Sequence, residues 1–465
     1  MTSTARLQEA LARGLDARVG VTAPAQVRGV FAGGALEAVV ASGDLPVAAE
    51  RTAFRIASCT KSFTAATALL LEADGLLDLD EPLADALDVP LRILGPDARQ
   101  PTVLDALAMR AGFPTDDPWA DRQESLPHDV FAALLGEGVR AIWPAGERFE
   151  YSNLGYAIVG RIVAARAGMP FRRVVESRLL EPLGLTGTGF DESVGGVVTG
   201  YRPGADSGRD ARTQTWEPLP FSTPGAFSPI GGLFSTATDL ARWCGVLSGA
   251  IDAGAVLPAG LVERMRHPQT PIAGDPAGGG VWSAYGLGLT LRGDSFGRVF
   301  VGHSGGYPGF TTRMQWEQGS GVGAVVFENA TYTALTPAVD AVFDDAFGVT
   351  DAMPAAPEPP AFAPWPETVA AASALRTSLV EGSLGDPAMF DACVDLDVPF
   401  ARREASLRAL LADVGGVTDA GPLTHESPAH ATWELRGPRG ALRCRLLMTP
   451  HAAPVVQKLD VVAAD

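Results

Sequence analysis

The chain has 465 residues, of which 46% are hydrophobic and 19% charged, so it can bury a core large enough for a globular protein. Its 36 Lys plus Arg and 54 Asp plus Glu give a formal net charge of −18, and no basic run could follow a phosphate backbone, so we expect no nucleic-acid partner. No apolar run reaches the ~18 to 20 residues of a membrane span, and four scattered cysteines argue against a zinc site or a disulfide framework.

The first half of the chain predicts a hairpin followed by helices. Residues 1–14 form an amphipathic pattern without the continuous apolar segment of a secretory signal, which favours a cytoplasmic location. A Gly-Gly turn between two apolar runs predicts a hairpin over 27–41, and the helical spacing of apolar residues predicts a helix from Ser58 to Gly75. Further helices are expected over 102–110, 153–167, 171–180 and 235–247.

The second half predicts a β meander, a linker and a smaller domain. Strands are expected over 285–291, 299–302, 310–316 and 323–327. Together with the early hairpin they predict an α+β catalytic domain, 1–353, whose sheet joins both ends of its sequence. Six prolines within 354–366 indicate a linker, and 367–465 is expected to form a small C-terminal α+β domain. Its expected helices are 369–379 and 401–411, and its expected strands are 432–435, 441–448 and 455–462.

The motif Ser58-Cys59-Thr60-Lys61 stands at the start of an apolar helix. Only two of the 36 basic residues are lysine, Lys61 and Lys458. A buried ammonium, unlike a guanidinium, can lose its proton and act as a base. Side chains three residues apart on a helix share one face, so the amine of Lys61 can take the proton of the Ser58 hydroxyl. Taken alone, the motif favours a capping serine beside a lysine that reaches solvent, because such short patterns recur by chance.

Two further motifs accompany it. Tyr151-Ser152-Asn153 precedes a predicted helix, and His303-Ser304-Gly305-Gly306 ends a predicted strand. In order and local structure the three motifs resemble the S-x-x-K, Y-x-N and K-T-G (or H-[ST]-G) elements of the serine β-lactamase and penicillin-binding-protein superfamily. The tyrosine and histidine versions look most like class C β-lactamases, family VIII esterases, D-aminopeptidases and penicillin-binding-protein-type thioesterases. The resemblance covers roughly Leu7 to Val349 and implies a β-lactamase/transpeptidase-like fold.

The resemblance also implies a role for each motif residue. Ser58 would be the acylated nucleophile, and Lys61 would accept its proton. Tyr151 would pass the proton to the leaving group and later activate the second acceptor, with a pKa lowered by nearby cations. Asn153 would orient Lys61 and a substrate amide. His303 replaces the lysine of K-T-G and would hydrogen-bond towards Tyr151 or a substrate carboxylate, without a charge at neutral pH.

The oxyanion hole implied by the same resemblance consists of the backbone N–H groups of Ser58 and Gly306. Such an arrangement requires the edge of a sheet to approach the start of the helix. The Gly305-Gly306 pair permits that approach because neither residue carries a Cβ.

A competing interpretation concerns Ser304, because residues 302–306 also fit the G-x-S-x-G nucleophile elbow of α/β-hydrolases. The elbow requires a helix directly after the serine, and the sequence Tyr307-Pro308-Gly309 does not favour one. The histidines that follow it lie beyond the proline-rich segment. We therefore expect Ser58, not Ser304, to be the nucleophile.

Other candidate site residues have simpler explanations. Cys59 points away from the Lys61 face and is expected to be a small buried residue rather than a nucleophile. His425 and His430 could suggest a metal, but they lack a third ligand and are expected to form a loop pair. The segment Asp116-Asp117-Pro118-Trp119 either lines the substrate cleft or forms a turn with a packed indole, and its spacing does not decide between them.

These observations predict a covalent acyl-transfer enzyme that needs no metal or organic cofactor. A small-molecule or peptide substrate, a peptidyl thioester bound to a carrier among them, would acylate Ser58. Water would release the acyl group in an esterase or amidase, and an intramolecular amine would release it in a peptide cyclase. A catalytically silent binding or scaffold protein of the same fold is the alternative, and the presence of Ser58, Lys61, Tyr151 and His303 counts against it.

Overall fold

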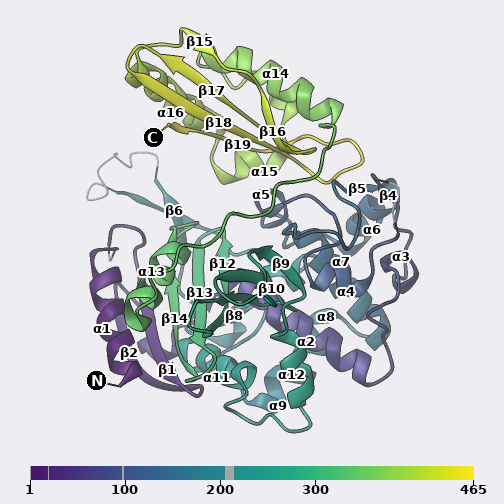
Figure 1. Cartoon of the computed structure of the whole chain (residues 1–465), viewed down its shortest axis with the longest axis vertical. Helices are drawn as coiled ribbons and strands as arrows, with labels where there is room; N and C mark the ends of the chain where they lie inside the picture. The colour runs from purple at the N-terminus through teal and green to yellow at the C-terminus, as the bar shows by residue number, and fades with distance from the viewer. Residues whose placement is uncertain (1, 19, 97–98, 205–213, 465) are drawn as a thin grey trace.

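The main sheet of the protein is antiparallel and has eight strands. In the computed structural model, residues 2–18, 20–96, 99–204 and 214–464 are described (Figure 1). The strand order is β2-β1-β14-β13-β12-β11-β10-β9, so the early hairpin pairs with the last strand of the meander. The strands are β1 (Gln26–Ala32), β2 (Ala35–Ser42), β9 (Thr270–Ala273), β10 (Trp282–Tyr285), β11 (Thr290–Gly293), β12 (Val299–Tyr307), β13 (Phe310–Glu317) and β14 (Val322–Glu328). The predicted α+β class is confirmed, with a sheet that joins distant parts of the sequence.

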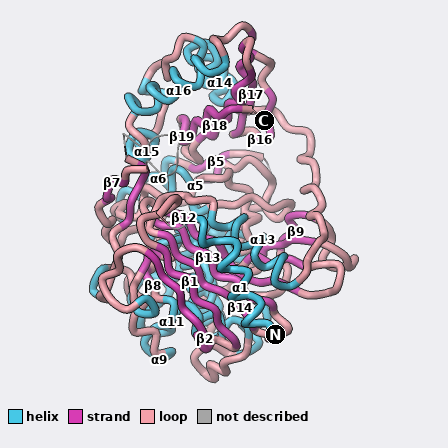
Figure 2. Tube along the Cα trace, turned by 90° about the vertical axis from the view of Figure 1, so that its left-hand side faces the viewer, coloured by secondary structure: helices cyan, strands magenta, loops and turns pink. Residues whose placement is uncertain are grey.

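Helices cover both faces of this sheet. α1 (Ser3–Leu15) and α13 (Leu335–Phe347) pack against each other and bury Leu7, Leu11 and Phe343 on one face. α11 (Ala237–Ser248) covers the opposite face, where it contacts β1, β13 and β14. Figure 2 shows the strands side by side with helices before and behind them. Because both faces are covered, β13 and β14 are buried along their whole length. β14 is apolar except for Glu328, whereas five of the eight residues of β13 are polar or charged.

A helical body lies beside the sheet and holds the second half of the candidate site. α2 (Thr60–Ala73) and α7 (Asn153–Ala167) are in contact, and both are buried along most of their length, polar residues included, as expected for helices in the centre of a core. The other helices of this region are α3 (Leu83–Ala86), α4 (Val103–Leu107), α5 (Asp117–Ala120), α6 (His128–Glu137), α8 (Phe171–Val175), α9 (Glu181–Leu183), α10 (Ser228–Gly231) and α12 (Ala259–Met265). Short strand pairs are β3 (Phe54–Arg55) with β8 (Phe234–Ser235), β4 (Ile93–Leu94) with β5 (Val139–Arg140), and β6 (Gly200–Pro203) with β7 (Trp216–Leu219).

The residues 366–464, here called the C-terminal unit, contain a second antiparallel sheet. Its strands are β15 (Asp419–Ala420), β16 (Thr424–Ser427), β17 (His430–Gly437), β18 (Gly440–Met448) and β19 (Val456–Ala463). Its helices are α14 (Pro366–Val380), α15 (Ala392–Asp397) and α16 (Phe400–Val414). Residues 349–365, which lead into it, contain no helix or strand. Among the described residues, none of the helices is both long and apolar enough to cross a bilayer.

The C-terminal unit is joined to the rest of the protein by polar contacts around α5. The side chain of Gln457 in β19 accepts a hydrogen bond from the Trp119 N–H at 3.2 Å and donates one to the Thr115 carbonyl at 3.0 Å. Asp397, at the end of α15, forms an ion pair with Arg122 just beyond α5. The segment that carries Asp117 is therefore held from outside by the C-terminal unit.

Three predicted elements differ from the structure. Residues 285–291 form no single strand, because Gly286–Leu289 turn the chain between β10 and β11. Gly288 has φ +71°, and a Cβ there would lie 2.5 Å from the Lys61 carbonyl, so the turn requires glycine. The helix expected over 171–180 ends as an α-helix at Val175 and continues as a π-helical turn. The helix expected from Ser235 begins at Ala237, because the Thr236 hydroxyl caps it.

One buried ion pair makes a testable contribution to stability. Glu328 at the end of β14 is fully buried, and Arg18 lies 3.1 Å from its carboxylate. We expect Arg18→Ala to lower the free energy of unfolding by about 3 kcal/mol, because it leaves a buried carboxylate without its cation. Urea unfolding followed by circular dichroism measures this. Arg13→Ala, which removes an exposed pair with Asp345, is the matched control and should leave the urea midpoint almost unchanged.

Candidate active site

Ser58 lies where a short 3₁₀ turn, Ala57–Cys59, leads into α2. Ala57 has φ +48°, an unusual value for alanine, which marks a constrained turn at the start of the helix. Gly305 of β12 lies directly against this turn. A Cβ at Gly305 would come within 2.3 Å of the Ile56 carbonyl oxygen and 3.1 Å of the Ser58 nitrogen. The absence of a side chain at position 305 therefore lets the strand reach the serine.

Lys61 is completely buried one turn further along α2. Its Nζ lies 2.9 Å from the Ser58 Oγ, 2.6 Å from the Asn153 Oδ1 and 2.9 Å from the Ile230 carbonyl oxygen. Burial lowers the pKa of Lys61 to about 8, although the negative charge of Asp117 works in the opposite direction. A lysine with such a pKa is partly uncharged near neutral pH and can accept a proton.

Asn153 is held by two neighbouring aspartates. The Asp116 carboxylate accepts hydrogen bonds from the backbone N–H groups of Asn153 and Leu154, at 2.7 and 2.8 Å, and so caps the start of α7. The side-chain Nδ2 of Asn153 donates to the Asp117 Oδ1 at 2.6 Å. The segment 116–119 is thus more than a surface turn, because both of its aspartates contact the Y-x-N motif.

Tyr151 lies next to Ser58 and Lys61, with the Lys61 Nζ 5.1 Å from the centre of its ring. The lowered pKa expected for Tyr151 is wrong for this structure: burial raises its pKa well above the usual value, and the charge of Asp117 adds to the rise. The neighbouring Ser58 hydroxyl offsets only part of this effect. Tyr151 is therefore a neutral phenol before any substrate binds.

His303 lies at the centre of β12 and is almost fully buried. Its Nδ1 lies 2.5 Å from the Ser304 carbonyl oxygen, to which it can donate, and its Nε2 lies 3.0 Å from the Tyr285 hydroxyl. Burial and the nearby Lys61 lower the pKa of His303 to about 3, so the ring is neutral at pH 7. Its ring centre lies 6.3 Å from that of Tyr151, and the expected hydrogen bond towards Tyr151 is replaced by the one to Tyr285.

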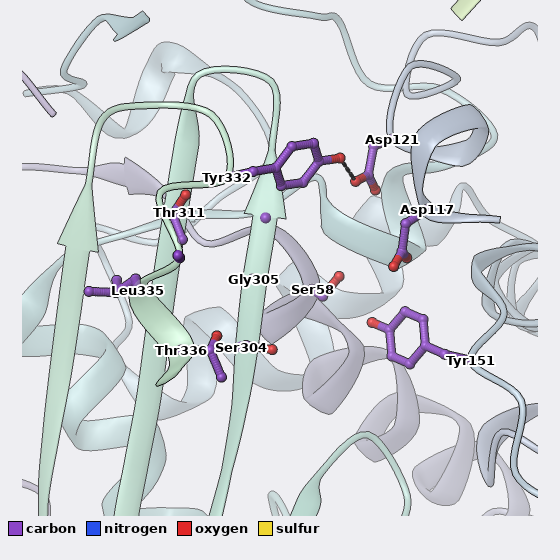
Figure 3. Close-up of a pocket in the computed structure, with 12 residues that line it drawn as sticks. Ser58, Asp117, Asp121, Tyr151, Ser304, Gly305, Thr311, Tyr332, Leu335 and Thr336 are labelled. Carbon is purple, nitrogen blue, oxygen red and sulfur yellow. Dashed lines mark hydrogen bonds between the residues drawn. The ribbon is translucent and has the colours of Figure 1, made fainter. Parts of the chain in front are cut away.

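Ser58, Tyr151 and the residues Ser304–Gly306 line a pocket of about 430 Å³, and Lys61, Asn153 and His303 are buried behind them. Figure 3 shows Ser58 between strand β12 on one side and Asp117 and Tyr151 on the other. Asp121 and Tyr332 close the far end, where the tyrosine hydroxyl donates to the carboxylate at 2.5 Å. No short motif contains Asp121 or Tyr332, so the sequence pattern gives no signal for either residue.

The alternative nucleophiles do not have suitable surroundings. Burial raises the pKa of Cys59 to about 12, and its Sγ contacts the His303 carbonyl oxygen, so it is not a thiolate. β12 continues through Ser304 to Tyr307 and leads into β13 by a tight turn, so the helix of a nucleophile elbow is absent there. His425 and His430 lie on paired strands, not in a loop, and Arg445 donates to the His430 Nε2.

The fold and these three motifs are those of a serine acyl-transfer enzyme, and a comparison with protein families identifies the family. The family model described as Beta-lactamase matches residues 15–348, more than two thirds of the sequence, and the chain belongs to this family. Its members are serine hydrolases and acyl-transferases. The match covers the main sheet and the helical body and ends before the C-terminal unit.

Among curated proteins, the chain is similar to Protein Rv1367c of Mycobacterium tuberculosis. The two are 30% identical over 240 residues, which cover 46% of this chain and 59% of that protein. Protein flp of Staphylococcus aureus is 29% identical over 152 residues, which cover 31% of this chain and 30% of that protein. The chain therefore spans only part of the length of the curated relatives it matches.

Solved structures with a similar fold include two that extend over the whole chain. The octameric penicillin-binding protein homologue from Pyrococcus abyssi has a TM-score of 0.61 and 19% identity, and the match covers 99% of this chain and 98% of that one. A structure named SurE has a TM-score of 0.58 and 21% identity, and the match covers 100% of this chain and 98% of that one. The D-amino acid amidase from Ochrobactrum anthropi has a TM-score of 0.56 and 24% identity, and the match covers 73% of this chain and 98% of that one. At these identities the likeness shows the fold alone, and it extends to the C-terminal unit.

Proposed function

We propose that the protein is a covalent acyl-transfer enzyme in which Ser58 is acylated by an ester, thioester or amide of a small or peptidic substrate. The observation that carries this proposal is the hydrogen-bonded set of Ser58, Lys61 and Asn153 at the base of a pocket. A serine hydroxyl is a poor nucleophile alone, and a buried amine with a pKa of about 8 is the base it needs.

The proposed reaction has two halves. As the Ser58 Oγ attacks the carbonyl carbon, its proton passes to the Lys61 Nζ, and the developing oxyanion binds the backbone N–H groups of Ser58 and Gly306. The bond to the leaving group then breaks, and Tyr151 delivers the proton to it and is reprotonated from Lys61. In the second half a nucleophile gives its proton to Tyr151 and Lys61 as it attacks the acyl carbon; the bond to the Ser58 Oγ then breaks, and Lys61 returns a proton to that oxygen.

The neutral state of His303 bears on the choice of substrate. A lysine in the K-T-G position would offer a positive charge to a substrate carboxylate, whereas the buried and uncharged His303 offers none. The described residues that line the pocket include Asp117 and Asp121 but no Lys or Arg, and burial raises the pKa of both carboxyl groups. Neutral peptidyl esters, thioesters and amides therefore suit the site better than carboxylate-bearing β-lactams. The fold shared with a D-amino acid amidase supports a preference for a D-residue at the acyl carbon.

The first test is labelling of the nucleophile. A fluorophosphonate probe should add its mass to the peptide that contains Ser58, and Ser58→Ala should remove the addition. Ser42→Ala, at the end of the edge strand β2, is the matched serine variant and should keep the added mass on Ser58. A protein that reacts with no serine-directed reagent would instead be the non-catalytic scaffold.

The second test separates hydrolysis from cyclisation. A peptidyl thioester ending in a D-residue is supplied with a free and with an acetylated N-terminus, and products are identified by mass spectrometry. A cyclic product from the free amine, with linear acid from the acetylated peptide, supports release by an intramolecular amine. Linear acid alone from every peptide excludes the cyclase and leaves a hydrolase.

The acylation rate should depend on pH through Lys61. Because the amine must be uncharged to accept the Ser58 proton, the rate should rise by about tenfold per pH unit below the pKa of about 8 and level off above it. His303 should contribute no step in this range, because its pKa of about 3 lies far below it. Fluorophosphonate labelling between pH 6 and 10, with folding checked by circular dichroism, measures the profile. A rate independent of pH would contradict a lysine base.

A further inference from the structure

The polar neighbours of Lys61 match an uncharged amine in one arrangement only. A neutral amine has two N–H donors and one lone pair. Asn153 Oδ1 and the Ile230 carbonyl are acceptors, and they take the two N–H groups at 2.6 and 2.9 Å. The lone pair is then left for the third neighbour, the Ser58 hydroxyl at 2.9 Å. This is the arrangement in which Lys61 can take the serine proton.

That arrangement depends on which end of the Asn153 amide faces Lys61. If the amide were turned over, its NH₂ group would face Lys61 and would seek the lone pair that Ser58 needs. The turned carbonyl oxygen would face the Asp117 carboxylate, which has no proton to offer when ionised. The hydrogen bond from Asn153 Nδ2 to Asp117 Oδ1, at 2.6 Å, therefore excludes the turned amide.

We infer that Asp117 is a positioning residue, which holds the Asn153 amide in the orientation that directs the lone pair of Lys61 at Ser58. This inference rests on the proposed role of Ser58 as the nucleophile. Asp117 is suited to the task by its place: α5 presents it to the pocket, and Gln457 of the C-terminal unit holds the backbone on both sides of it.

The local structure does not explain Asp117 in any other way. Asp117 begins α5, a helix of four residues, but no side-chain capping hydrogen bond is formed there. Within the described part of the chain, no Lys, Arg or His forms a salt bridge with Asp117, and its side chain bonds to Asn153. Burial raises the pKa of the Asp117 carboxyl, and the charge of Lys61 and the hydrogen bond from Asn153 offset part of that rise, so the groups that stabilise the carboxylate belong to the Ser58 site.

The charge of Asp117 has a second effect on the same amine. It is the strongest of the charges that favour the protonated form of Lys61, and it opposes the effect of burial. Without it, Lys61 would become a weaker base. Several other groups also face or surround this amine and stay in place when Asp117 is changed. They are Asp116, Asp121, Cys59, Tyr151, Tyr156, Tyr285 and His303.

Two substitutions separate the two effects. Asp117→Asn removes the charge but keeps an oxygen that can accept from Asn153. Asp117→Ala removes both the charge and the acceptor. Asp44→Asn, at an exposed position after β2, is the matched loss of one negative charge away from the site.

The first measurement does not require turnover. Because the chain has only two lysines, Lys61 and Lys458, lysine isotopically labelled at Cε gives two NMR signals, and Lys458→Arg assigns them. We expect the pKa of Lys61 to fall by about one unit in Asp117→Asn and to stay unchanged in Asp44→Asn. An unchanged pKa of Lys61 in Asp117→Asn would overturn the inference.

The second measurement is the rate of fluorophosphonate labelling across pH. In Asp117→Asn the acid limb should move to lower pH together with the pKa of Lys61. In Asp117→Ala the rate on the high-pH plateau should fall by about ten- to a hundredfold, because the amide is free to turn. A plateau in Asp117→Ala equal to that of the wild-type protein would overturn the inference, even if Ser58 is labelled.

The two measurements keep the two proposals apart. If the wild-type protein is not labelled at Ser58, the proposed function fails, while the titration of Lys61 still decides whether Asp117 governs that amine. If Asp117→Ala does not fold, Asp117→Leu, which fills the space of the carboxylate without an acceptor, takes its place, and a high-pH plateau equal to that of the wild-type protein would again overturn the inference.

Discussion

Lys61→Met should lower the rate of Ser58 acylation by about 10³-fold while the protein stays folded. Methionine has nearly the length of lysine and fits an apolar site, but it cannot take a proton. The buried amine is costly to desolvate, so its removal should offset part of the loss of the hydrogen bonds to Asn153 and Ile230. The melting temperature should therefore change by only a few degrees, which separates a chemical defect from an unfolded one.

The matched control for this variant is Lys458→Met. Lys458 lies on β19 in an ion pair with Asp460, and about a third of its side chain is exposed. Its removal should leave the labelling rate within about twofold of the wild-type rate. Equal rates for the wild-type protein and Lys61→Met would contradict a lysine base and with it the proposed mechanism.

Gly305→Ala should disable the site by a different route. The new methyl group would lie 2.3 Å from the Ile56 carbonyl oxygen and 2.9 Å from the Ala57 Cβ, both in the backbone region that carries Ser58. The strand and the turn must separate, so the backbone N–H groups of Ser58 and Gly306, the proposed oxyanion hole, would move apart. We expect the labelling rate to fall by about a hundredfold and the free energy of unfolding to fall by about 1–3 kcal/mol.

Gly260→Ala is the appropriate comparison. Gly260 lies in α12, and no atom lies within 4 Å of a Cβ built there. Alanine favours a helix by about 1 kcal/mol over glycine, so this variant should unfold at the same or a higher urea concentration. Activity in Gly305→Ala equal to that in Gly260→Ala would show that the contact between β12 and the serine turn is not needed.

Local sequence patterns were sufficient to predict the parts of the site that lie on regular elements. Ser58 and Lys61 are close because they share a helix, and the predicted helix from 153 to 167 matches α7. The hairpin and the meander follow from glycine turns between apolar runs, and the order of the strands follows from their pairing. These features depend on residues close together in the sequence, where periodicity and turn residues carry the information.

Other features depend on contacts that no local pattern records. The bond from Asn153 to Asp117 joins residues 36 positions apart, and that from Trp119 to Gln457 joins residues 338 apart. The raised pKa of Tyr151 arises from the desolvation of its phenol beside Asp117, which the fold alone determines. The apolar residues continue through the turn at Gly286 and Gly288, so the pattern of apolar residues does not reveal the break in the strand expected over 285–291.

The position of Gln457 has a consequence for building hybrid enzymes from this chain. Its amide side chain forms hydrogen bonds with the main chain at residues 115 and 119, on either side of Asp117. Replacing the C-terminal unit with that of a relative would therefore affect Lys61 indirectly, because Gln457 fixes the position of the segment 115–119, which carries Asp117. Chimaeras that keep glutamine at position 457 should retain activity more often than chimaeras that lose it.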